Sequence, residues 1–86
     1  MSISNNNSTR IKTLEFNDKI FVHLTSDDIL AIPYDYTDRL SKANRDDLQS
    51  YYLIGGGIGV HFKNIDEDIS LSGIIDYKMN HELISS

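Results

Sequence analysis

The sequence predicts a small two-layer α+β domain, in which an antiparallel sheet packs against one or two short helices. Three observations predict this class. Short β-prone runs follow one another closely from residue 11 onward, with turn-forming residues between them. Residues that cap helices then stand before short segments with apolar positions at helical spacing. Finally, 86 residues are enough for a single domain with one small core.

We expect that single domain to span residues 10–78. Residues 1–9 are polar and rich in Asn and Ser, so they bury too little apolar surface to offset the entropy lost on ordering. The sequence therefore predicts a flexible N-terminal segment over residues 1–9. Residues 79–86 are expected to form a C-terminal tail whose end frays.

A three-stranded meander is expected to open the domain. Two β-prone runs, 11–16 and 20–24, are separated by the turn residues Asn17, Asp18 and Lys19, which predicts a hairpin. We expect Asn17 or Asp18 to adopt the left-handed conformation that such a loop requires. A loop of three residues, rather than two, places four apolar side chains on one face of the sheet: Leu14, Phe16, Ile20 and Val22.

The third strand of the meander is predicted over residues 29–32. It follows a turn whose side chains hydrogen-bond their own backbone, and it ends at Pro33, which cannot donate to a ladder. Acidic residues flank it on both sides (Asp27, Asp28 and Asp35), so we interpret this strand as a sheet edge that is either guarded by charge or open to a basic partner.

Helices are predicted in the middle and at the end of the chain. Thr37 is placed to cap a segment that runs through residue 42, and Asn44 is placed to cap the next, with Asp47 at the capping-box position. These two segments are either separate helices or one interrupted helix. Ser70 is expected to cap a final short helix.

One or two later strands, over 51–54 and 58–62, flank a cluster of glycines. The cluster lacks both the Gly-Lys-Ser/Thr of a P-loop and the third Gly that opens a helix in a dinucleotide-binding fingerprint. We therefore interpret it as a tight turn or a bulge. One core is expected beneath the helices, formed by Leu14, Phe16, Ile20, Val22, Leu24, Leu30, Ile32, Leu40, Leu48, Val60, Phe62 and Ile74.

Composition excludes several classes of function. Thirteen acidic residues against eight basic ones give a net charge of −5, which argues against direct binding of nucleic acid. The absence of Cys excludes disulfides and thiolate chemistry. No apolar run reaches the length of a membrane span, and the first ten residues lack the apolar middle of a signal peptide. We expect a cytoplasmic protein with no cofactor and no membrane partner.

The densest group of titratable side chains is His61 with Asp66, Glu67 and Asp68. Two carboxylates and an imidazole suit a metal ion or acid–base chemistry, so a small enzyme that uses His61 with Asp66 or Asp68 is the alternative function. In an extended segment, however, neighbouring side chains point to opposite faces, so at most Asp66 and Asp68 converge. We favour a solvated turn and expect neither a metal site nor catalytic residues.

Tyr34 and Tyr36 flank Asp35 directly after the third strand. Tyrosine combines a large contact area with a small entropy cost, which suits a protein interface. The alternative is that one ring packs into the core and the other covers its rim. We predict that Tyr34, Asp35 and Tyr36 contribute to partner binding.

The segment Gly55–Ser70, followed by Gly73-Ile74-Ile75, resembles a bacterial domain-of-unknown-function family, number twenty-four forty-two. The C-terminal signature of that family runs Gly-Ile-His-Trp/Phe and then Asp-Glu-Asp-Ile-Ser, and Lys63 stands here in place of its common Pro. The resemblance implies a small α+β fold, no established catalytic residues, and a regulatory or antitoxin-like role. We interpret the matching signature residues as structural: Gly57, Gly59, His61, Asp66, Glu67 and Asp68.

These observations together predict a non-catalytic protein-interaction module. It is expected to bind a small protein partner, or a second copy of itself, through a sheet edge. Its acidity suits a basic partner, because complementary charge accelerates encounter.

Overall fold

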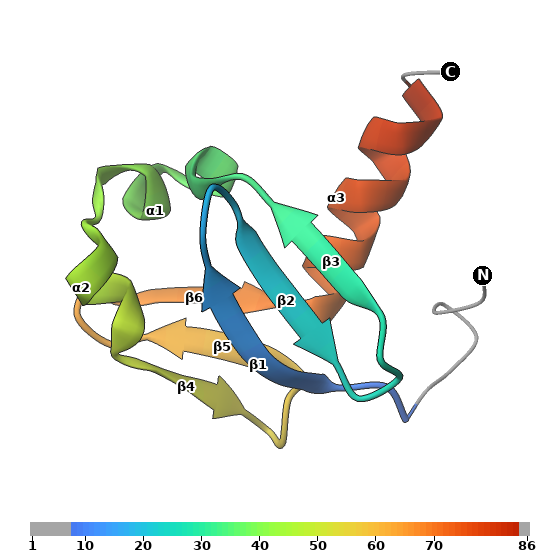
Figure 1. The fold of residues 1–86 in the computed structure, drawn as a ribbon, viewed down its shortest axis with the longest axis horizontal. Coiled ribbons are helices and arrows are strands. Elements are labelled where there is room, and N and C mark those ends of the chain that lie inside the picture. The colour runs from blue at the N-terminus through green and yellow to red at the C-terminus, as the bar shows by residue number, and fades with distance from the viewer. Residues whose placement is uncertain (1–7, 85–86) are drawn as a thin grey trace.

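The structure, a computed structural model, describes residues 8–84, with the side chains of residues 8–80. It confirms the α+β class and contains two antiparallel three-stranded sheets (Figure 1). The first sheet has the strand order β1 (Ile11–Phe16), β2 (Ile20–Leu24) and β3 (Ile29–Ile32). A 3-10 turn, η2 (Tyr34–Tyr36), and two helices, α1 (Asp38–Lys42) and α2 (Arg45–Gln49), lead to the second sheet. That sheet has the order β4 (Tyr51–Ile54), β5 (Gly59–Phe62) and β6 (Glu67–Ser70), and α3 (Leu71–Ile84) follows it.

The predicted register of the first hairpin is confirmed. Leu14 lies opposite Val22 and Phe16 lies opposite Ile20. A bulge at Lys12 then shifts the register, so that Ile11 pairs with Leu24 and is buried. Strict alternation from Leu14 would turn Ile11 to the other face, and for this reason the predicted core omits it.

The prediction of a left-handed residue at Asn17 or Asp18 is wrong. Among the described residues other than glycine, positive φ angles occur at Asp27 (72°) and Asp66 (52°). The hairpin turn is closed instead by the N–H of Asn17, which donates to the carbonyl of Lys19 over 3.0 Å. The left-handed residue of the meander thus lies in its second turn, at Asp27.

The caps of α1 and α2 are those that the sequence predicts. The Thr37 hydroxyl accepts the N–H of Leu40 at 3.2 Å, and the Asn44 side chain accepts the N–H of Asp47 at 2.9 Å. Ala43 between them has an extended backbone (φ −82°, ψ 150°), so the segment forms two separate helices.

The expected solvated turn contains Asp66, which is exposed, but it ends there, because Glu67 and Asp68 begin the strand β6. Its register pairs Phe62 with Glu67 and His61 with Asp68. Acidic residues have low strand propensity, so the sequence gives little indication of this strand. The pairing is stabilised because Ile69, the residue after Asp68, lies opposite Val60 and is buried in the core.

The final helix is longer than predicted. Its expected cap is confirmed, since the Ser70 hydroxyl accepts the N–H of Gly73 at 3.0 Å. The helix continues to Ile84, so residues 79–84 are helical and do not form the expected tail. Figure 1 shows its far end projecting beyond the sheets. Of the predicted flexible segment, residues 1–7 lie outside the described residues, whereas Thr9 is buried.

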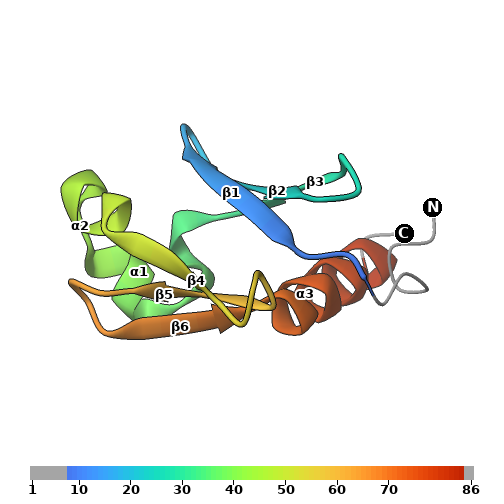
Figure 2. The same ribbon diagram turned by 90° about the horizontal axis from the view of Figure 1, so that it is seen from below.

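The first sheet lies over the second, and the core fills the space between their facing sides (Figure 2). Phe16 and Leu30, which we expected inside, are half-buried and pack against it. No helix among the described residues is both long and apolar enough to cross a membrane. The buried core consists of Ile11, Leu14, Ile20, Val22, Leu24, Ile32, Leu40, Leu48, Val60, Phe62, Ile69, Leu71 and Ile74.

Candidate functional site

Tyr34 is held between the first hairpin and α2. Its hydroxyl donates to the carbonyl of Asn17 over 2.6 Å. The guanidinium carbon of Arg45 lies 5.2 Å from the centre of the Tyr34 ring, which is a cation–π contact. Arg45 also donates to the carbonyls of Phe16 (3.0 Å) and Asn17 (3.1 Å), so these two side chains fasten the hairpin turn to the start of α2.

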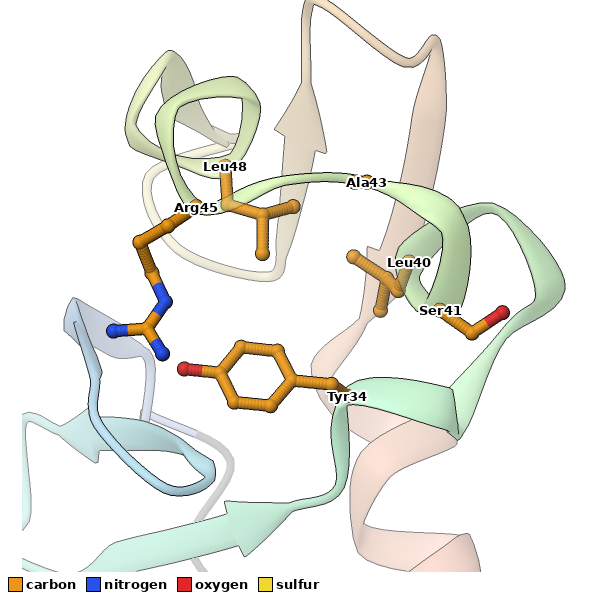
Figure 3. Close-up of a pocket in the computed structure, with 6 residues that line it drawn as sticks. All are labelled: Tyr34, Leu40, Ser41, Ala43, Arg45 and Leu48. Atoms are coloured by element: carbon orange, nitrogen blue, oxygen red, sulfur yellow. The ribbon is translucent and has the colours of Figure 1, made fainter.

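A cavity of about 250 Å³ opens beside this contact (Figure 3). Leu40 and Leu48, each 1% exposed, point into it, whereas the Ser41 hydroxyl points away. Ser41 instead donates to the carbonyl of Asp38 over 2.8 Å. Because both leucines are almost fully buried, they present little surface to this cavity, which is lined by Tyr34, Leu40, Ser41, Ala43, Arg45 and Leu48.

Tyr36 packs against α3. Its ring meets that of Tyr77 edge to face, with the ring centres 5.0 Å apart. Burial raises the pKa of the Tyr36 hydroxyl above its ordinary value, and Tyr77 raises it further. Asp35 between the two tyrosines is exposed. Both tyrosines predicted to bind a partner thus make intramolecular contacts.

A row of three side chains crosses the outer face of the second sheet: Tyr52, His61 and Asp68, each opposite the next in neighbouring strands. The Tyr52 and His61 rings lie 5.1 Å apart, centre to centre. Nδ1 of His61 is hydrogen-bonded to the Asp68 carboxylate. Tyr52 is 55% exposed, so the row ends in an open aromatic side chain at the edge strand β4.

The other acidic residues of the cluster do not join this row. The Asp66 carboxylate is 3.9 Å from Nη1 of Arg39, which also donates to the Asp66 carbonyl over 2.6 Å. Glu67 is half-buried. Asp66 and Asp68, the two carboxylates that alternation would allow to converge, thus contact different partners, Arg39 and His61. Within residues 8–80 no three His, Asp or Glu side chains are placed to hold a metal ion.

The glycines of the family signature lie where the two sheets meet. Gly55, Gly56 and Gly57 all have positive φ angles and form the tight β4–β5 turn. The carbonyl of Gly57 accepts the N–H of Ile11 over 2.8 Å, which ties this turn to β1. A side chain on Gly59 would meet the Ile69 carbonyl at 2.9 Å, so a close backbone approach requires glycine there.

The edges of β1 and β6 carry a contact and charges, respectively. On β1, the N–H of Leu14 donates to the Tyr51 hydroxyl over 3.1 Å. The helix α3 lies behind β3 and contacts it, and no strand of the described chain pairs with the outer edge of β3 (Figure 1). The strand β6 carries Glu67 and Asp68, and charged residues on an edge disfavour unplanned pairing.

The fourth edge, on β4, is uncharged and open. The N–H of Lys63 donates to the carbonyl of Ser50 over 3.1 Å, so Ser50 faces β5. Because facing alternates along a strand, the backbone groups of Tyr51 and Leu53 point outward. No strand of the described chain pairs with them, and β4 lies at the lower margin of the molecule in Figure 1.

The predicted partner-binding residues include neither of the two side chains that define these surfaces, Tyr52 and Arg45. Alternation along residues 51–54 and 58–62 carries a signal for Tyr52, because it places Tyr52 on the same face as His61. Arg45 carries no comparable signal. Its contacts with Tyr34 and the hairpin turn arise only when α2 folds back toward the first sheet.

Comparison with known proteins agrees with this architecture. The structure is similar to the crystal structure of a protein of unknown function from Rhodospirillum rubrum, with a TM-score of 0.72 and 26% identity over 81% of this chain and 88% of that one. It shares its fold with an uncharacterized protein from Chromobacterium violaceum solved by NMR, with a TM-score of 0.69 and 23% identity. That match covers 78% of this chain and 64% of the other.

A search of curated proteins returned no match. The family model described as "Protein of unknown function (DUF2442)" matches residues 11–80, which includes all six strands, α1 and α2. This match confirms the resemblance carried by the glycine cluster and the Asp-Glu-Asp-Ile-Ser run. The chain belongs to the DUF2442 family.

Proposed function

We propose that this chain is a non-catalytic protein-interaction module that binds a small protein partner at the outer edge of β4. The observation that carries the proposal is the outward-facing backbone of Tyr51 and Leu53, which no strand of the described chain pairs. A partner segment in extended conformation would add a strand there through main-chain hydrogen bonds. The exposed ring of Tyr52 would supply apolar contact beside it.

The net charge of the whole chain and the lack of charge along the β4 edge favour different features of a partner. The net charge of −5 favours a basic partner, because it attracts such a partner over a distance set by salt screening. Residues 50–60 carry no charge, so the contact itself favours an uncharged segment of that partner. A regulatory or antitoxin-like role, as partner of a small basic protein, fits this combination.

Acid–base catalysis was the alternative from the sequence. The structure pairs His61 with Asp68, while Asp66 lies beside Arg39. Of the carboxylates named for that alternative, Asp68 is therefore the one beside His61, and Asp66 is not. In our proposal the His61–Asp68 pair lies next to Tyr52 and forms the polar side of the binding face.

The test compares two substitutions that introduce the same charge on two different edge strands. Tyr52→Lys changes β4, and Ile29→Lys changes β3, where Ile29 is 53% exposed. The purified chain and both variants are used to capture partners from the source cell, and the affinity of the recovered protein is then measured. We expect Tyr52→Lys to weaken binding by at least about tenfold, since a lysine on an edge opposes strand addition.

Ile29→Lys is expected to bind like the wild type. A partner that is lost with Ile29→Lys but retained with Tyr52→Lys would move the site to β3 and overturn the proposal. Recovery of no partner would also overturn it. Light scattering on the chain alone identifies the case in which the occupant of β4 is a second copy.

A further inference from the structure

We propose that two copies of this chain pair their β4 edges when no protein partner is bound, so that the partner displaces a second copy from the edge it takes. The inference rests on the proposed function, because it concerns the same edge and names what occupies that edge in the free chain. The second sheets of the two copies would join into one antiparallel sheet of six strands, with the two β4 strands at its centre.

The position of β4 leaves room for a second copy. In Figure 1 the strand runs along the lower margin of the molecule, and the first sheet and the helices lie on one side of it. A copy turned by 180° about an axis perpendicular to the second sheet would place its own β4 alongside, with its other elements directed away. Such a two-fold contact uses the same surface of both copies, so that surface must be complementary to itself.

The backbone of β4 is complementary to itself in one register. Its outward groups belong to Tyr51 and Leu53. When two such residues lie opposite each other in an antiparallel pair, they exchange both of their N–H···O bonds. Tyr51 opposite Leu53 of the copy, and Leu53 opposite Tyr51 of the copy, gives two such pairs with the two-fold axis at Tyr52. A shift by two residues would leave one of the two pairs.

In this register Tyr52 lies opposite Tyr52 of the copy, in a pair without hydrogen bonds, where facing side chains are closest. Its ring is 55% exposed and lies on the outer face of the second sheet beside His61. Ile54, two residues further along the strand, is on the same face and would meet the ring of the copy on the diagonal. The pairing thus covers the aromatic side chain that the free edge leaves open.

Charge opposes this contact only weakly, although each copy has a net charge of −5. Residues 50–60 carry no charge. Asp68 lies on β6, two strands away from β4. In the joined sheet the two Asp68 side chains would be about 24 Å apart, at about 4.8 Å per strand, which exceeds the Debye length of about 8 Å at physiological salt. A basic partner is attracted by the net charge and a second copy is not, which favours displacement of the copy.

We expect the pair to be weak, with a Kd on the order of 0.1–1 mM, because so short a strand makes an interface of the smallest class. In dilute solution the chain is then mainly monomeric and its β4 edge is free. Sedimentation equilibrium on the chain alone, from micromolar to millimolar concentration, should show the average mass rising toward that of a dimer. A monomeric mass at every concentration would overturn the proposal.

Cross-linking tests the register. The chain contains no Cys, and opposite residues in a pair without hydrogen bonds have Cα atoms about 4.5 Å apart, which a disulfide can span. Under mild oxidation we expect Tyr52→Cys to form a covalent dimer at least about tenfold faster than Ile29→Cys, because pairing raises the effective concentration of the two thiols. Ile29 is the matched control, since it is 53% exposed on the edge strand β3. Equal rates for the two variants would contradict pairing at β4.

These measurements use the chain without a partner, so they fail separately from the test of the proposed function. A chain that captures a protein at β4 but neither dimerises nor cross-links selectively would refute the self-pairing alone. A chain that dimerises through residue 52 but captures no protein would refute the proposed function alone. Where both occur, addition of the captured protein should convert the dimer into the complex, and a dimer that persists in the complex would contradict a shared edge.

Discussion

At the scale of single residues, Tyr51 connects the two sheets through its hydroxyl. That hydroxyl accepts the N–H of Leu14 at 3.1 Å and is hydrogen-bonded to the Thr13 hydroxyl at 3.0 Å. Tyr51→Phe leaves the ring in place but removes the acceptor, so we expect the free energy of unfolding to fall by about 1–2 kcal/mol. Tyr52→Phe, at the exposed neighbouring position, should change it little. Urea denaturation of both variants measures the difference, and equal values would show that the bond to β1 contributes nothing.

The Glu15 carboxyl makes the stability of the first hairpin depend on pH. Its hydrogen bond with His23 (2.9 Å) lowers the pKa of the carboxyl below its ordinary value of 4.5, and a bond from Asn17 lowers it further. A depressed carboxyl pKa contributes stability that is present above pH 4.5 and is lost as the pH falls through the lower folded value. We expect Glu15→Gln to flatten the fall in Tm below pH 4.5 relative to wild type. Parallel Tm curves for the two proteins in that range would contradict this assignment.

At the scale of elements, the sequence predicted the features that depend on neighbouring residues, namely strand register and helix starts. The register of β1 on β2 follows from the alternation of Leu14 and Phe16, and the helix starts follow from Thr37, Asn44 and Ser70. The remaining features depend on tertiary contacts. The bulge at Lys12 becomes favourable only because it buries Ile11, and β6 forms because β5 pairs with a segment that has little strand propensity of its own.

Substitutions in the β4–β5 turn measure how closely this turn packs against β1. Gly57 has a φ of 115°, and a Cβ there would lie 2.6 Å from the Ile11 carbonyl oxygen. Gly56 has a φ of 73° and open space around it. We expect Gly57→Ala to destabilise the chain by about 3 kcal/mol, from backbone strain and a clash with β1, and Gly56→Ala by about 1 kcal/mol, from strain alone. If chemical denaturation gives the two variants the same free energy of unfolding, the turn is not closely packed against β1.

At the scale of the whole molecule, the candidate site was the least predictable part. The sequence singled out Tyr34 and Tyr36, but their intramolecular partners, Arg45 and Tyr77, lie on the later helices α2 and α3. Spacing along a sequence gives no information about such contacts. The same limit applies to the sheet edges. The predicted edge at residues 29–32 is confirmed, because β3 is an edge strand, but the contact of α3 with β3 and the openness of β4 depend on how the two sheets and the last helix assemble.

The open edge of β4 is tested most directly by amide hydrogen exchange, measured on the chain alone and in complex with its captured partner. In the free chain, the outward N–H groups of Tyr51 and Leu53 should exchange faster than that of Tyr52, which faces β5. On binding, the Tyr51 and Leu53 amides should become protected, because a new strand accepts their hydrogen bonds. Unchanged exchange at both amides in the complex would contradict strand addition at β4.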